Sequence, residues 1–128
     1  MQPKSPLLQA FLAGAIDNAA FRHADHVRVG FELLGAHDFT TAAQAFSTAL
    51  RAIARRAENP AAYHETITIA FLALIAERSA GGGFDGVEDF LQRNADLLDK
   101  AILERWYAPE RLCSAVARRV FILPEARR

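Results

Sequence analysis

Three histidines stand in two short segments whose residue types could build a metal site. His23 and His26 occur in FRHADHVR, and His64 occurs in YHETIT. Three neutral imidazoles with an open fourth position form a catalytic zinc site, whereas two imidazoles with a carboxylate suit non-haem iron. We therefore expect one divalent transition metal ion, zinc or iron before copper, bound by His23, His26 and His64.

Two side chains next to His64 could take part in chemistry at that metal. Glu65 can act as a general base, as a metal ligand or simply as a favourable acid in the first turn of a helix. Tyr63 can act as an acid or position a substrate. The sequence predicts Glu65 and Tyr63 as the catalytic residues of a metal-dependent enzyme for a small-molecule substrate, with Lewis-acid and redox chemistry both open.

Two other interpretations fit the same histidines. Imidazoles inside a small core need polar partners, so the three rings could form a structural hydrogen-bonded network. The chain would then be a non-enzymatic helical binding or interaction protein. A metal-free acid/base site is the other alternative.

The elements that must position these residues are helices. Apolar residues recur at helical spacing, and strand-like alternation is confined to the tail at 120–123. Capping residues, prolines and glycines mark the ends of the expected helices. Four main helices are expected over 6–17, from 18 to about 34, from 40 to about 58 and from 60 to about 79. Short helices should follow from 86, over 95–107 and from 109, and 115–123 fits either a helix or an extended segment.

The predicted fold class is therefore all-α, a compact bundle of four main helices plus short C-terminal helices. At about 100° per residue, His23 and His26 lie roughly 60° apart on one side of the second helix. Gly30 shares that side, where it would let another helix or a small ligand come close. His64, read as part of the fourth helix, shares a face with Phe71. Packing of these two helices would bring the three imidazoles together.

Composition limits the remaining classes of protein. A chain of 128 residues with 52% hydrophobic content can bury one core, so residues 1–128 are expected to form a single helical domain. Its 15 basic and 15 acidic residues leave no basic field for nucleic acid. The most apolar run, 67–76, is too short to cross a membrane. Exposed apolar helix faces would allow a homodimer.

The single cysteine bears on the cellular compartment. Cys113 cannot form an internal disulfide or a two-cysteine zinc site, which fits a soluble, cytoplasmic protein. We expect Cys113 to be a small buried residue, and Trp106 and Tyr107 to be core and rim aromatics. His37 should be an exposed turn or cap residue.

The segments FRHADHVR, YHETIT and ARRVFILPE together resemble an uncharacterised family of small helical bacterial proteins with FxHxxHVR, YHExIT and ARRVFxLP motifs. The resemblance extends over nearly the whole chain after residue 20, so that residues 1–20 look like an added N-terminal helix. A looser similarity links the chain to DinB-type bundles, which hold a metal with three histidines at a different, HxxxH spacing. The matching positions are Phe21, His23, His26, Tyr63, His64, Glu65, Thr66, Thr68 and Arg118 to Pro124.

Overall fold

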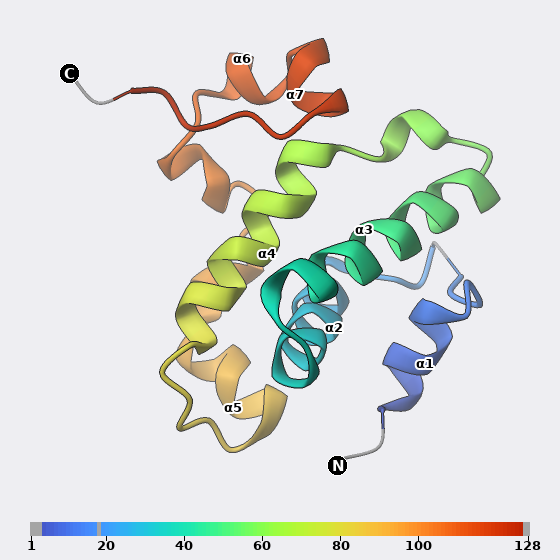
Figure 1. Ribbon diagram of the computed structural model, residues 1–128, viewed down its shortest axis with the longest axis vertical. Helices are drawn as coiled ribbons and strands as arrows, with labels where there is room; N and C mark the ends of the chain where they lie inside the picture. Colours follow the sequence, from blue (N-terminus) through green and yellow to red (C-terminus); the bar gives the residue numbers. More distant parts are fainter. Residues whose placement is uncertain (1–3, 18, 127–128) are drawn as a thin grey trace.

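Helices make up the ordered framework of the chain. The structure is a computed structural model that describes residues 4–17 and 19–126. Over these residues it contains seven α-helices, three 3-10 turns and no strand (Figure 1). In chain order they are α1 (Pro6–Leu12), α2 (His23–Ala36), α3 (Phe39–Arg56), η1 (Pro60–Ala62), α4 (Glu65–Ser79), α5 (Gly86–Arg93), η2 (Ala95–Leu98), η3 (Ile102–Arg105), α6 (Pro109–Leu112) and α7 (Ala115–Arg119).

Three long helices, α2, α3 and α4, form the centre of the molecule and each contacts the other two. Helix α1 packs on α2 and α3, α5 packs on α2 and η2, and α7 lies beside the start of α4 (Figure 1). The all-α prediction is confirmed, whereas a bundle of four main helices is not. The first helix ends at Leu12 instead of residue 17, because Gly14 adopts a left-handed φ of 71° that stops the helix.

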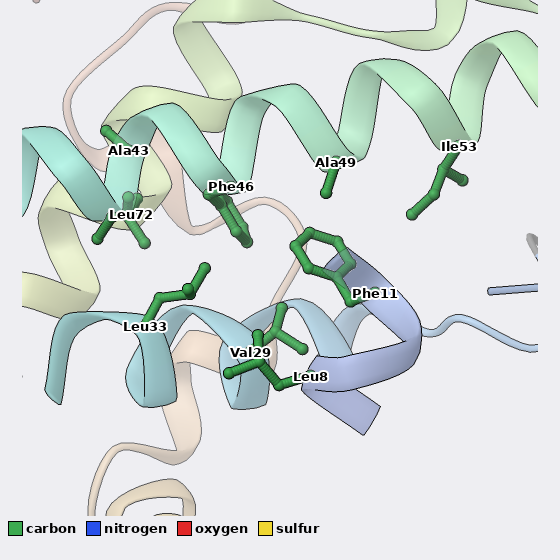
Figure 2. Packing of buried hydrophobic residues seen from close by; sticks show 10 residues of the cluster. Leu8, Phe11, Val29, Leu33, Ala43, Phe46, Ala49, Ile53 and Leu72 are labelled. Carbon is green, nitrogen blue, oxygen red and sulfur yellow. The ribbon is translucent and has the colours of Figure 1, made fainter. Parts of the chain in front are cut away.

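The core has two adjoining parts. One lies between α1, α2 and α3, where Phe11 points towards the apolar residues of α3 and Leu8 lies beside Val29 of α2 (Figure 2). The other joins α2 and α4 to α5, η2 and η3. At the contact of α2 with α4, a Cβ on Gly30 would lie 3.0 Å from Ile75 Cδ1 and 3.2 Å from Leu72 Cδ1. Of the two predicted uses of Gly30, the close approach of another helix is confirmed.

Several predicted helix boundaries are wrong. The second helix begins at His23 instead of residue 18, which itself lies outside the described residues. Asp17 Oδ1 accepts the Ala19 N–H at 3.1 Å in a separate turn before the helix. The fourth helix begins at Glu65, because residues 60–62 form a 3-10 turn that ends before it. Residues 95–107 form two 3-10 turns instead of one helix, and the tail is extended after Arg119.

Other predicted positions can be compared directly. His37 is the exposed C-cap residue of α2, as expected. Tyr107 is buried, with its hydroxyl donating to the Ile122 carbonyl at 2.9 Å, and Trp106 is exposed at the rim. Cys113 is exposed, so the prediction of a buried cysteine is wrong. Among the described helices, none has the length and apolar character needed to span a membrane.

Candidate functional site

Most of the predicted site residues surround one cavity of about 860 Å³. It lies between the start of α2, the C-terminal half of α3, the η1–α4 junction and the η2–η3 segment. Its lining includes His23, His26, Tyr63 and His64 but not Glu65. The other lining residues are Ala19, Phe21, Arg22, Ala24, Phe46, Leu50, Ile53, Ala54, Ala57, Asn59, Ala62, Ile67, Thr68, Phe71, Leu98, Lys100 and Leu103.

His64 caps helix α4 instead of belonging to it. Its Nδ1 accepts the Ile67 N–H at 3.1 Å, the bond that an N-cap side chain normally makes. Its Nε2 lies 2.7 Å from the Leu112 carbonyl oxygen, which can only accept, so Nε2–H is the donor. The ring is buried, and both of its nitrogens are used by the backbone. His64 can bind a metal only by giving up one of these hydrogen bonds.

The same segment anchors the C-terminal tail. The Thr66 hydroxyl, fully buried, donates to the Val120 carbonyl at 2.8 Å and accepts the Ile122 N–H at 3.1 Å. In addition, Arg118 Nη1 donates to the Ala61 carbonyl at 2.6 Å. YHETIT and ARRVFILPE, two of the motifs singled out in the sequence, therefore contact each other through hydrogen bonds to the backbone.

His23 is held by one hydrogen bond and leaves one nitrogen for other partners. Its Nε2 lies 2.9 Å from the Leu97 carbonyl oxygen, so Nε2–H donates and Nδ1 carries the lone pair. The ring packs against Phe71, with the two ring centroids 4.9 Å apart. A histidine whose second nitrogen donates to a backbone carbonyl has the orientation usual for a metal ligand, although structural histidines make the same bond.

His26 is the least constrained of the three imidazoles. Its ring centroid lies 4.6 Å from that of Phe21 and 6.1 Å from that of His23. Within the described part of the chain, neither of its ring nitrogens has a hydrogen-bond partner. Burial lowers the pKa of His26 to about 4; nearby His23 and Lys100 lower it as well, and Asp25 partly opposes them. The ring is therefore neutral at physiological pH, with one donor and one acceptor nitrogen.

Glu65 and Tyr63 are hydrogen-bonded to each other, and of the two only Tyr63 lines the cavity. The Tyr63 hydroxyl donates to Glu65 Oε1 at 2.5 Å, and Arg51 Nη2 donates to the same oxygen at 3.1 Å. The Arg51 guanidinium also lies over the Tyr63 ring, 4.4 Å from its centroid. Burial, with the hydrogen bond to Glu65, raises the pKa of Tyr63. This group ties α3 to the start of α4, and the catalytic roles of Glu65 and Tyr63 stay predictions.

The predicted three-histidine metal group can be compared with the placement of the candidate ligands. No cluster of three or more histidine, cysteine, aspartate or glutamate side chains among the described residues has the geometry to hold a metal ion. Both nitrogens of His64 bond to the backbone, and metal binding by the three histidines stays a prediction. His23 and His26 remain neighbours.

Two basic residues of the cavity were missed by the sequence reasoning. Arg22 precedes α2 and Lys100 follows η2, and both are exposed at the mouth. Arg22 could have been noticed because it adjoins His23. No sequence pattern pointed to Lys100, because the turn that brings it close to the start of α2 cannot be predicted from neighbouring residues.

Comparisons of the chain with family models, with curated proteins and with solved structures find no match. The resemblance based on the three motifs stays a prediction.

Proposed function

We propose that this protein binds a small molecule in the His26 cavity. The observation that carries the proposal is a cavity of about 860 Å³ whose least constrained polar group is one neutral imidazole among apolar walls. Ligand sites typically have this volume and this pattern of a few polar groups in an apolar lining. Phe21 and Phe71 supply aromatic wall, and His26 supplies one hydrogen-bond donor and one acceptor.

The other two histidines support the cavity in this proposal. Their hydrogen bonds to the Leu97 and Leu112 carbonyls join α2 and α4 to segments far along the chain. The low pKa of His26 also favours binding over general-base catalysis, because an efficient base has a pKa close to the working pH. The proposed class is therefore a helical ligand-binding protein with a structural pair of histidines.

Cavity filling tests the proposal. Ala24 lines the cavity and is half-buried, whereas Ala36 is exposed at the other end of the same helix. We expect 2-naphthamide to shift the backbone amide NMR signals of residues 21–26 and 63–68 in the wild-type protein and in Ala36→Trp. Ala24→Trp should lose these shifts while staying folded. Equal shifts in both variants, or shifts elsewhere only, would refute the proposal.

A metal bound by His23 and His26 is the second candidate, and the orientation of His23 favours it. With Nε2–H donated to Leu97, His23 Nδ1 is a free lone pair on a ring 6.1 Å from that of His26. Zinc, iron or copper would be bound by two imidazoles and completed by solvent or substrate.

Metal titration separates this candidate from simple ligand binding. Tag-free protein should bind about one Zn²⁺ per chain in calorimetry and contain about one metal by elemental analysis. Binding should vanish in His26→Ala and persist in His37→Ala, whose imidazole is exposed on the C-cap of α2. Absence of stoichiometric metal from the wild-type protein, both as purified and after titration, would exclude the candidate.

A further inference from the structure

The charged side chains that line the cavity are both basic. Arg22 and Lys100 lie at its mouth, and no aspartate or glutamate lines it among the residues that the structure describes. Of the acids that adjoin lining residues in the chain, Asp25 and Glu65 each form an ion pair with an arginine at 3.1 Å. Glu58 and Asp99 are exposed and are not part of the lining. A ligand in the cavity therefore meets two positive charges and no carboxylate of the lining.

The interior of the cavity has a different character from its mouth. Phe46, Ile53 and Phe71 are buried apolar side chains of the lining, and half-buried Leu50 extends this wall along α3. His26 lines the cavity beside Phe21 and lies close enough to Lys100 to feel its charge, and as a neutral imidazole it can donate one N–H. The cavity thus offers an apolar surface inside, one hydrogen-bond donor near it and two cations outside.

From this arrangement we infer that the cavity selects a small carboxylate with an apolar body, the body inside and the carboxylate between Arg22, Lys100 and His26. The inference rests on the proposed function of the cavity as a ligand site. A carboxylate loses water on entering and needs charged donors in exchange, which the two basic side chains provide. An ammonium ligand would face like charges, and an uncharged ligand would gain nothing from them.

Two matched sets of probes test the selectivity, one aromatic and one aliphatic. The first comprises 2-naphthoate, 2-naphthamide and 2-naphthylmethylammonium; the second comprises decanoate, decanamide and decylammonium. Affinities are measured by NMR titration of the full chain at low salt, because partly exposed charges are screened at high salt. We expect the carboxylate of at least one set to bind about tenfold tighter than its amide, the combined effect of two exposed ion pairs. The two sets show whether aromatic or aliphatic acids are preferred.

Charge removal at the mouth supplies the decisive comparison. The double variant Arg22→Gln/Lys100→Gln should reduce the preference for carboxylate over amide to less than threefold. Lys4→Gln/Arg119→Gln removes the same charges away from the cavity and should keep the tenfold preference.

The outcomes distinguish the inference from the proposed function. If the amide or ammonium probe binds in the cavity as tightly as the carboxylate, the inference is overturned and the ligand-binding proposal stands. Equal loss of preference in both double variants also overturns it, because the effect would then come from net charge alone. If no probe shifts the signals of cavity residues, both are overturned.

Discussion

Removal of His64 gives the clearest test of whether this histidine is a structural residue or a metal ligand. The structure assigns both ring nitrogens to the backbone, through the Ile67 N–H and the Leu112 carbonyl. His64→Ala should therefore destabilise the protein in the complete absence of metal and of ligand. A residue that acts only as a metal ligand would have little effect under those conditions.

The magnitude follows from the interactions that the variant loses. Removing an N-cap side chain costs about 1 kcal/mol. Losing the hydrogen bond to Leu112 costs about 1 kcal/mol, and leaving that carbonyl without a partner adds to it. The ring is only 8% exposed, so its packing contributes as well. We expect a total loss of about 3 kcal/mol, a large share of the 5–15 kcal/mol typical of a domain, and a fall in Tm of about 10 °C.

Two further substitutions divide this loss between the two nitrogens. In His64→Asn, the side-chain oxygen can take the place of Nδ1 and cap the helix, so about 1 kcal/mol should be regained. His64→Gln can reach towards Leu112 but caps poorly. His37→Ala, on an exposed imidazole, is the matched control and should change stability by less than about 0.5 kcal/mol.

Urea unfolding with excess chelator measures all four variants. The structural role predicts that His64→Ala is the least stable and that His64→Asn lies between it and the wild type. If His64→Ala matched the wild type within about 0.5 kcal/mol without metal but lost metal-induced stabilisation, the argument from its hydrogen bonds would be wrong.

Three other predictions concern the framework around the cavity. Thr66→Val should cost about 2 kcal/mol in urea unfolding and accelerate amide exchange at Ile122, because two hydrogen bonds to the tail are lost; unchanged exchange would contradict it. Gly30→Leu should lower the free energy of unfolding by about 2 kcal/mol, because the new side chain would overpack against Ile75. Thermal unfolding should show a lower Tm, and an unchanged Tm would refute the prediction. Hydrogen bonding to Arg78 lowers the pKa of Asp96 from 3.8 to about 2. The contribution of this carboxylate to the free energy of unfolding is therefore complete above pH 3.8 and is lost as the pH falls through 2. Because this carboxylate is about one third exposed, Asp96→Asn should cost only about 1 kcal/mol at pH 7, and a penalty that persists below pH 2 would contradict the assignment.

The sequence predicted the helical class and part of the cavity because both depend on local patterns. The apolar periodicity of α3 is strong, and the helical wheel placed His23 and His26 on the side of α2 that faces the cavity. Gly30 was correctly marked as a position of close approach. These features require only the geometry of a single helix.

The errors arose where a long-range contact decided the structure. The sequence extended the fourth helix through His64, because Asn59 and Pro60 look like a cap and a first helical residue. They open only a 3-10 turn, and the helix is restarted four residues later by the histidine itself. The partner that fixes this arrangement, the Leu112 carbonyl, lies 48 residues away. No local propensity contains that information.

The contrast between the three histidines also explains why residue types alone suggested a metal centre. Imidazole, hydroxyl and carboxylate groups serve in catalysis and metal binding, and they also form hydrogen bonds with buried backbone N–H and carbonyl groups. A sequence alone does not distinguish these two uses. In this fold His23, His64 and Thr66 bond to carbonyls far along the chain, and Glu65 bonds to Tyr63 and Arg51. His26 differs because its polar atoms are not used by the described framework. A partly buried polar group that has no hydrogen-bond partner in the protein can gain free energy when a ligand supplies that partner. His26 is such a group, and it is therefore the position at which we propose to look for function.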